Sequence, residues 1–214
     1  MSGICGYIGP AAPGTVQAML DAIAYRGDRT DVHEAATSGL GYRWWGDRPG
    51  KSPGLYRSGT TVAAVCGTFA PCVSTPAEAL PARLRAEGGL ADLDGAFAGA
   101  VWDVATRTLH LIRDPFGVRS LYYVEHAGTL YFASELKQLL AVEALPVAVD
   151  FHALHKYLTF SFVPGEDVPI QGIKRLLPGH VMTWREGRAE STPYFQPREA
   201  LDPALAEEPD ARRV

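Results

Sequence analysis

From residue 93 onward, short apolar segments follow one another with only brief polar turns between them, and this pattern constrains the fold most strongly. Residues 96–102 and 108–113 are separated by the turn VATR, while residues 121–124 and 129–133 flank the turn HAG. Apolar runs of this length bounded by turn residues are typical of β-strands, and a short turn joins two of them as a hairpin. The pattern therefore predicts a series of consecutive strands.

The rest of the chain adds strands and a few helices. Further strands are predicted at 3–9 and 61–65, with a hairpin at 179–195. Helices are predicted at 16–24, 76–87, 134–141 and 151–157. Ser134 and Asp150 are the expected N-caps of the last two helices.

Two stretches are predicted to be loops. Residues 25–34 (YRGDRTDVHE) have the composition of a turn or loop, and the segment 46–60 is rich in Gly, Pro and charge, as in a surface excursion. Strands with interspersed helices predict an α+β fold, in which two antiparallel sheets are covered by helices.

Composition limits the classes of partner. A chain of 214 residues with 47% hydrophobic and 21% charged residues can bury a full core. Its net charge of −4 gives no reason to expect nucleic acid or an anionic membrane as partner. No segment approaches the roughly 20 apolar residues that span a bilayer, and the N-terminus lacks the pattern of a secretory signal. The expected location is the cytoplasm.

Neither the cysteines nor the glycines form a recognisable ligand motif. Cys5, Cys66 and Cys72 are too few and too irregularly spaced for a disulfide framework or a zinc site, so we expect reduced apolar fillers and no metal. The phosphate-binding loops GxxxxGK[ST] and GxGxxG do not occur in the sequence. No cofactor is therefore expected in this chain, and by itself it should not bind ATP.

Several multi-residue blocks resemble one known family. The blocks are DGAFAGAVWD, RDPFGVRSLYY, FASELKQLL, YLTFSFVPG and GIKRLLPGH. They are similar to the N-terminal glutaminase domain of the asparagine synthetase family, a class II glutamine amidotransferase. The resemblance implies the four-layer αββα sandwich of N-terminal-nucleophile hydrolases over residues 1–195, with 196–214 as a polar tail or the start of a linker. It also implies a synthetase domain as partner, in cis or in trans, which would use ATP and Mg²⁺.

The resemblance places Ser2 at the position of the catalytic nucleophile. The family opens with Met-Cys-Gly-Ile, whereas this chain opens with Met-Ser-Gly-Ile, and removal of Met1 would make Ser2 the terminal residue. A terminal nucleophile uses its own α-amine as base, and a hydroxyl is a weaker nucleophile than a thiol. Cys5 has no free amine beside it and is not expected to substitute. Ser2 is thus either a weak catalytic residue or a structural one.

The remaining pocket positions depart from the family's pattern. The family's Asn-Gly-Glu loop corresponds here to Cys66, Gly67 and Thr68, so the side-chain amide that would stabilise an oxyanion and one carboxylate for the substrate ammonium are both replaced. The family's Ser-Asp-Thr-Glu block is reduced to STPAE, which lacks its aspartate. Near the position of the arginine that clamps the substrate carboxylate stands Trp44, with Arg43 one residue away. On a strand, that shift turns a side chain to the opposite face.

These departures favour a degenerate amidotransferase domain that has lost glutaminase activity and serves a structural role for a synthetase domain. β-Lactam synthetases and lasso-peptide cyclases resemble this arrangement, so amide formation on a peptide or natural product is one expectation. The alternatives are an active asparagine synthetase fragment that uses Ser2, and a non-catalytic regulatory or scaffolding subunit. A homo-oligomer is compatible with the sequence.

Overall fold

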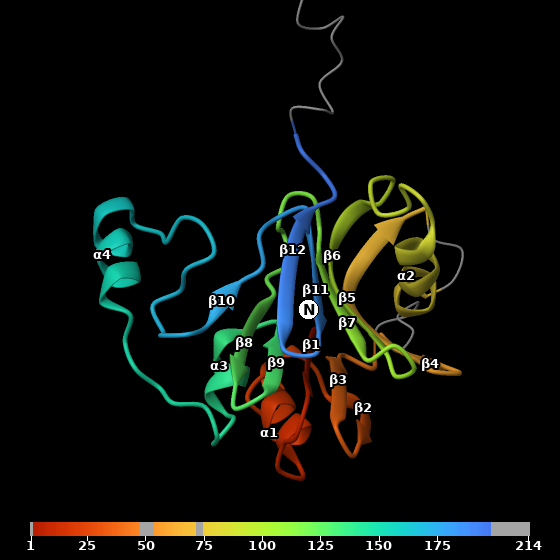
Figure 1. Cartoon of the computed structure of the whole chain (residues 1–214), viewed down its shortest axis with the longest axis horizontal. Helices are drawn as coiled ribbons and strands as arrows, with labels where there is room; N and C mark the ends of the chain where they lie inside the picture. Colours follow the sequence, from red (N-terminus) through yellow and green to blue (C-terminus); the bar gives the residue numbers. More distant parts are fainter. Residues whose placement is uncertain (1, 48–53, 72–74, 198–214) are drawn as a thin grey trace, which may run out of the picture.

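The computed structural model describes residues 2–47, 54–71 and 75–197, and places two sheets face to face with helices outside them (Figure 1). Its elements in chain order are β1 (Gly3–Ile8), α1 (Thr15–Asp21), the 3-10 turn η1 (Ala24–Arg26), β2 (Arg29–Ala35), β3 (Ser38–Trp44), β4 (Leu55–Ser58), β5 (Thr61–Ala70), α2 (Pro76–Arg85), β6 (Asp94–Asp103), β7 (Thr108–Arg113), β8 (Tyr122–His126), β9 (Thr129–Ala133), α3 (Leu136–Leu140), α4 (Phe151–Phe160), β10 (Lys174–Arg175), β11 (His180–Arg185) and β12 (Arg188–Pro193).

Each sheet has six strands, and all the strand pairs are antiparallel. The first sheet has the order β10-β8-β9-β1-β3-β2, and the second has the order β12-β11-β7-β6-β5-β4. In the first sheet β1 is central: Cys5 pairs with Gly41 of β3 on one side and with Ala133 of β9 on the other. The first strand of the chain therefore lies inside the sheet and not at its edge.

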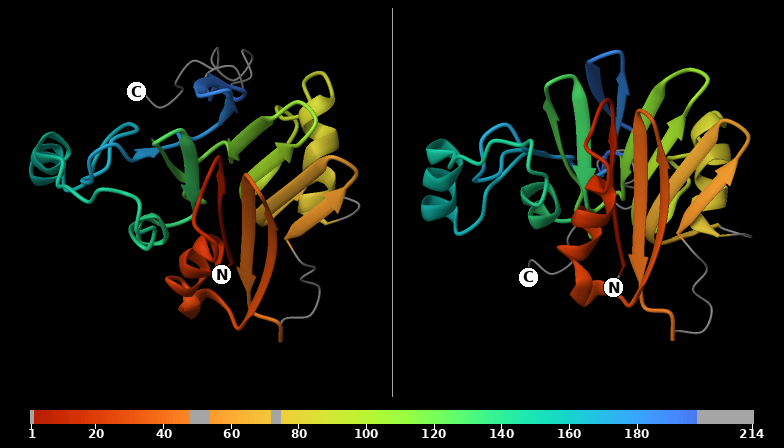
Figure 2. Two further views of the ribbon diagram at one scale, coloured as in Figure 1. Left: turned by 60° about the horizontal axis from the view of Figure 1, so that its bottom comes forward. Right: turned by 90° about the horizontal axis from the view of Figure 1, so that it is seen from below.

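Three apolar clusters separate four layers. One lies between the sheets and includes Ile4, Phe132, Leu111 and Trp102. A second lies where α1 and α3 cover the outer face of the first sheet, and a third lies under α2 on the outer face of the second. Figure 2 shows these helices on opposite sides of the paired sheets. The predicted α+β sandwich, with four layers in the order αββα, is confirmed.

The segment 25–34 was predicted to be a turn or loop, but its residues 29–34 belong to strand β2, so the prediction was wrong for this part. β2 is an edge strand whose seven residues are at most half-buried, and it is defined by pairing with β3 from Arg29 opposite Trp44 to Ala35 opposite Ser38. An exposed edge strand does not need alternating apolar residues, so the polar sequence of β2 carries no strand pattern.

Two smaller predictions also need correction. The excursion at 46–60 includes β4, which pairs with β5 from Leu55 opposite Ala64; residues 48–53 lie outside the described part. Helix α3 is capped by Glu135 and not by Ser134, because Glu135 and Gln138 form a reciprocal capping box.

The N-cap role of Asp150 in α4 is confirmed, since its side chain accepts a hydrogen bond from the backbone N–H of Ala153. The hairpin at the end of the described chain is confirmed as β11–β12.

Candidate functional site

Ser2 lies directly before β1, at the side of the core where β1, β3 and β5 approach one another. Its side chain is buried, with 4% of the residue exposed, and it lies near the hydroxyl of Tyr42 on β3, where it acts against the burial-induced rise in the pKa of that hydroxyl. Its carbonyl accepts a hydrogen bond of 2.8 Å from the guanidinium of Arg26. Arg26 and Tyr42 are thus neighbours of Ser2 that the sequence did not identify as part of the site.

Cys66, on β5, supplies the buried thiol of the same region. Its Sγ lies 3.7 Å from the Oγ of Ser134, which follows β9. That hydroxyl also accepts a hydrogen bond of 2.9 Å from the N–H of Ile4, and the N–H of Ser134 donates to the carbonyl of Ile4. Burial raises the pKa of the Cys66 thiol, so it stays protonated and is a poor nucleophile at neutral pH.

A cluster of charged and aromatic groups closes the outer side of Ser2. The carboxylate of Glu135 accepts hydrogen bonds from Arg26 and from the hydroxyl of Tyr25, and Lys137 lies 3.7 Å from the centre of the Tyr25 ring. Burial acts to raise the pKa of Glu135, but the hydrogen bonds from Tyr25 and Arg26 hold it below its usual range. Glu135 is therefore ionised and already paired, so it is not a free carboxylate for a substrate ammonium.

Cys5 points away from this region. Along β1, Ile4 and Ile8 belong to the cluster between the sheets, whereas Cys5 and Tyr7 belong to the cluster under α1 and α3. Cys5 is fully buried, its Sγ lies 3.9 Å from the carbonyl oxygen of Val16, and burial raises the pKa of its thiol. The strand alternation thus separates Cys5 from Ser2 by the thickness of the sheet.

Gly67 and Thr68 continue β5 beyond Cys66. Gly67 has a φ of +101°, and a Cβ at this position would lie 2.0 Å from the carbonyl oxygen of Ala96. Only glycine fits this close approach of β5 to β6. Thr68 is exposed and has no carboxylate to offer. This part of the predicted pocket thus has a backbone shape that requires glycine and offers no carboxylate.

Arg43 and Trp44 lie on opposite faces of β3, as the register argument predicts. On the side of α1, the guanidinium of Arg43 donates hydrogen bonds to the backbone carbonyls of Gly27 (2.7 Å) and Leu20 (3.0 Å). Trp44 stacks on Tyr42, with ring centres 5.2 Å apart, and packs against the cluster between the sheets. The face that would carry a carboxylate clamp is occupied by an indole.

The STPAE segment has a structural task. Thr75 caps helix α2 by accepting a hydrogen bond from the backbone N–H of Glu78, and Pro76 begins the helix. Pro at the first helical position and an acidic residue in the first turn both favour a helix N-terminus. The residues that replace the family's Ser-Asp-Thr-Glu block therefore start a helix.

Arg119 is a further positive group near the buried thiol. Its Nε is buried and has no hydrogen-bond partner among the described residues, and its charge counteracts the burial-induced rise in the pKa values of Tyr42 and Cys66. The sequence analysis did not identify Arg119 as part of the site. Its only signal was its place in RDPFGVRSLYY, which does not reveal that the turn folds back toward the core.

Within residues 2–47, 54–71 and 75–197, no group of three or more His, Cys, Asp or Glu side chains is arranged to hold a metal ion. No helix in the same ranges is long and apolar enough to span a membrane. Cys5 and Cys66 are free thiols, while Cys72 lies outside the described residues.

Two facing six-stranded sheets, helices on both outer faces and a buried second residue at the start of a central strand define an N-terminal-nucleophile hydrolase sandwich. A fold comparison agrees: the glutamine phosphoribosylpyrophosphate amidotransferase of Bacillus subtilis superposes with a TM-score of 0.65 at 16% identity, covering 90% of this chain and 49% of that chain.

The comparisons of sequence identify the family. Residues 81–195 match the family model described as the glutamine amidotransferase domain, so the chain belongs to that family. A putative glutamine-hydrolysing asparagine synthetase of Mycobacterium bovis is 36% identical over 125 residues, which are 56% of this chain and 19% of that protein. Asparagine synthetase 1 of Bacillus subtilis is 34% identical over 111 residues, 51% of this chain and 17% of that protein. The matches cover about a fifth of the length of these relatives, and the chain is an asparagine-synthetase-like class II glutamine amidotransferase domain.

Proposed function

We propose that this domain does not hydrolyse glutamine and that it supports the synthetase domain of an amide-forming enzyme of the asparagine synthetase type. The observation that carries the proposal is the state of Ser2. The hydroxyl at the nucleophile position is buried near Tyr42. Cys66, which stands where the resemblance expects an amide donor, is a buried protonated thiol.

The loss is cumulative. Removal of one oxyanion donor costs about 3 kcal/mol of transition-state stabilisation, and a serine hydroxyl adds a further penalty relative to a thiolate. Thr68 offers no charge, and Arg43 is engaged by backbone carbonyls on the far face of β3. Substrate binding and chemistry are therefore both expected to fail.

The partner domain is expected to activate a carboxylate with ATP and Mg²⁺, after which an amine attacks. With no ammonia delivered by this domain, the amine can be a group of another molecule, as in the formation of peptide or natural-product amides. We further expect the domain to act in the cytoplasm.

The direct test is glutamate release from glutamine by the purified chain with Met1 removed, the removal being checked by mass. We expect rates at the level of Ser2→Ala, and little rescue by Ser2→Cys because the binding pocket is altered as well. Glutamate release comparable to that of a cysteine-bearing relative, and abolished by Ser2→Ala, would establish the alternative of an active glutaminase that uses Ser2. A regulatory or scaffolding subunit would instead bind a protein that is not a synthetase.

A further inference from the structure

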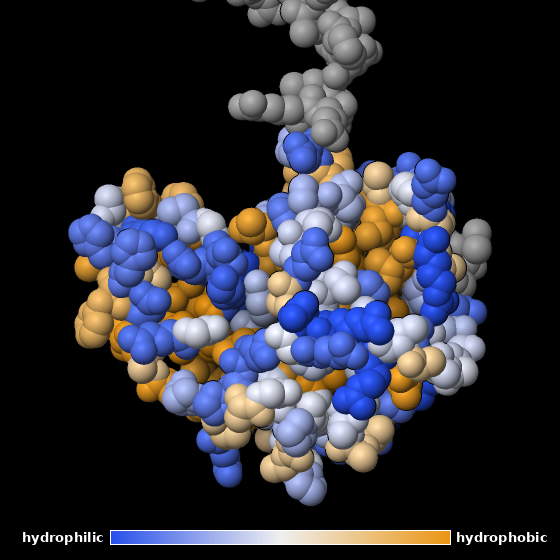
Figure 3. All heavy atoms as spheres, in the orientation of Figure 1, coloured by the Kyte–Doolittle hydropathy of each residue, from blue (hydrophilic) through white to orange (hydrophobic). Residues whose placement is uncertain are grey.

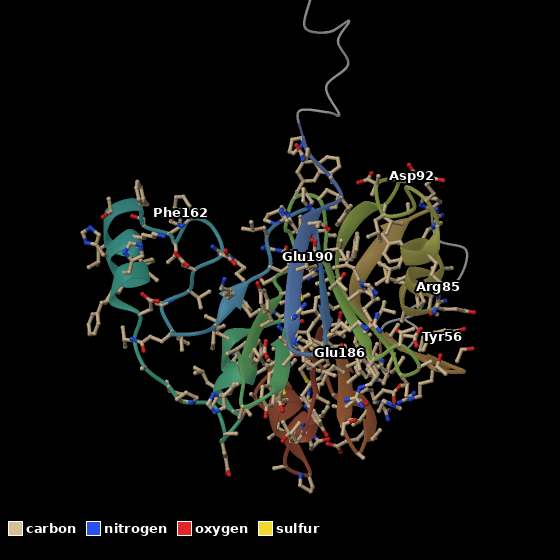
Figure 4. The ribbon with its side chains drawn as sticks, viewed as in Figure 1. Tyr56, Arg85, Asp92, Phe162, Glu186 and Glu190 are labelled. Carbon is tan, nitrogen blue, oxygen red and sulfur yellow. The ribbon has the colours of Figure 1, made fainter. Side chains whose placement is uncertain are left out.

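The residues from 147 to 175 form a projection that we call the arm, with α4 at its outer end. Figures 1 and 2 show α4 standing apart from both sheets. Of the thirteen large hydrophobic residues that are exposed in the described parts, seven lie between 147 and 162. They are Val147, Val149, Phe151, Tyr157, Leu158, Phe160 and Phe162. The space-filling view shows apolar side chains at the surface of the arm, and Phe162 lies beside the helix (Figures 3 and 4).

Few side chains of α4 are buried against the rest of the described chain. Ala153 is the one buried residue of α4, whereas Phe151 and Leu158 are 76% and 74% exposed. Phe151 and Leu158 are seven residues apart and therefore lie on one face of the helix. A monomeric protein rarely exposes a contiguous set of large apolar side chains unless they meet another surface.

The arm is held in shape by backbone contacts at its base and by an ionic contact between α4 and the returning chain. An isolated bridge pairs Val149 with Ile170, and the N–H of Gln171 donates to the carbonyl of Ala148 at 2.9 Å. The Nζ of Lys156 lies 2.5 Å from the carboxylate of Asp167. Arg175 adds hydrogen bonds to the carbonyls at 163 and 165. A preordered apolar surface loses little conformational entropy on binding, which is the property of a docking element.

Charge and area indicate the chemistry of the partner. Lys156 is paired with Asp167, and Lys174 with Glu166, so the arm presents aromatic and aliphatic groups and not a net charge. A fully buried aromatic side chain hides about 150–250 Å², so four of them supply several hundred Å². This is the scale of an interdomain interface of about 600–1,500 Å².

We infer that the arm is the surface by which this domain docks onto the apolar face of its synthetase domain; the inference rests on the proposed function. Two observations favour this occupant over a second copy. The arm lies within residues 81–195, the stretch shared with the family, so its partner is expected to be one that the family shares. The relatives are about five times longer than the matched region, and the remainder of such a protein provides a large surface next to this domain.

The test uses helix-compatible substitutions on the exposed face. Phe151→Asp places an acid in the first turn of α4 and Leu158→Lys places a base in its last turn, so both suit the helix dipole. Val104→Lys is the matched control, because Val104 is 50% exposed in the turn between β6 and β7. Circular dichroism and thermal unfolding of each variant verify that the fold is retained.

If the synthetase is a separate polypeptide, the tagged chain is purified from its own cells at high salt and the bound proteins are identified by mass spectrometry. If both domains share a polypeptide, the same substitutions are made in it and calorimetry reports whether the domains unfold together. We expect the double variant to retain at most about a tenth of the synthetase that the wild type binds. In the shared polypeptide, we expect the double variant to unfold in two thermal transitions where the wild type shows one. Val104→Lys should change neither result.

Synthetase that binds the double variant as well as the wild type would overturn the role of the arm but leave the proposed function standing. Dimerisation through the arm, abolished by the double variant, without bound synthetase would assign the surface to a second copy. A monomeric chain with no synthetase bound would overturn both proposals.

Discussion

The thiol of Cys66 lies 3.7 Å from the hydroxyl of Ser134, and this contact joins β5 of one sheet to the end of β9 in the other. Through the same hydroxyl, Ser134 holds the backbone of β1 at Ile4. The start of β1 is therefore positioned by groups that do not depend on which side chain stands at position 2.

Both described thiols should be inaccessible in the folded protein. Burial raises the pKa values of Cys5 and Cys66, so neither solvent access nor thiolate formation favours reaction. In a Cys72→Ser background we expect a thiol reagent to label the native protein at least about 100-fold more slowly than the denatured protein, because opening the core costs about 5 kcal/mol or more. Rapid labelling of either residue in the native state would contradict the burial of both thiols.

Gly67→Ala should destabilise the domain strongly. The new Cβ would lie 2.0 Å from the carbonyl oxygen of Ala96, and the residue would be held at a φ of +101°. We expect a loss of about 3 kcal/mol or more in the free energy of unfolding, from clash and backbone strain together. Gly59→Ala is the matched control: its φ is +55° and a Cβ there meets nothing within 4 Å, so a loss of about 1 kcal/mol is expected. Equal losses in urea titrations would disprove the steric argument.

Glu135 should make stability depend on pH at the acid end. The pKa of Glu135 is lower in the folded protein than its ordinary value of 4.5, which makes the unfolded chain the better proton binder. Its contribution is therefore complete above the ordinary value and is lost as the pH falls from there through the lowered value. Glu135→Gln, which leaves Arg26, Tyr25 and Lys137 without the carboxylate, should cost about 1–3 kcal/mol at pH 7.

The control for this prediction is Glu190→Gln on β12, where the side chain is exposed (Figure 4). In urea titrations between pH 7 and pH 3, the free energy of unfolding should fall less steeply toward low pH for Glu135→Gln than for the wild type. For Glu190→Gln the pH dependence should be unchanged. An unchanged slope for both variants would show that Glu135 is not held ionised by its partners.

Arg113→Lys should be costly although the charge is retained. The guanidinium of Arg113 donates to the carbonyls of Arg119 (2.7 Å), Gly117 (2.7 Å) and Leu176 (2.6 Å), which fixes the RDPFG turn against the following strand. An ammonium group cannot reproduce this planar set of donors. We expect a loss of about 2–3 kcal/mol in the free energy of unfolding. Arg107→Lys in the exposed turn should lose less than about 0.5 kcal/mol, and an equal effect would refute the role of the guanidinium.

The elements with strong local signals were predictable from the sequence. The strand at 129–133 and the cap at Asp150 have apolar runs or capping residues within a few positions of the chain, and the structure confirms both. The same holds for the opposite faces of Arg43 and Trp44, because a strand alternates its side chains with a period of two. The resemblance to amidotransferase domains is likewise contained in contiguous blocks.

The tertiary structure decided what depends on contacts between distant segments. Nothing near Arg29 in the sequence predicts β2, because the edge strand exists through its hydrogen bonds with β3. Local pattern likewise predicts Ser134 as a helix cap, whereas in the fold its hydroxyl contacts Ile4 and Cys66, 130 and 68 residues away. Local patterns thus determined most of the strands and helices, but not the edge strands β2 and β4. The environment of Ser2 required the fold, since its neighbours Arg26 and Tyr42 come from the η1 turn and from β3, which only the tertiary structure brings to the start of β1.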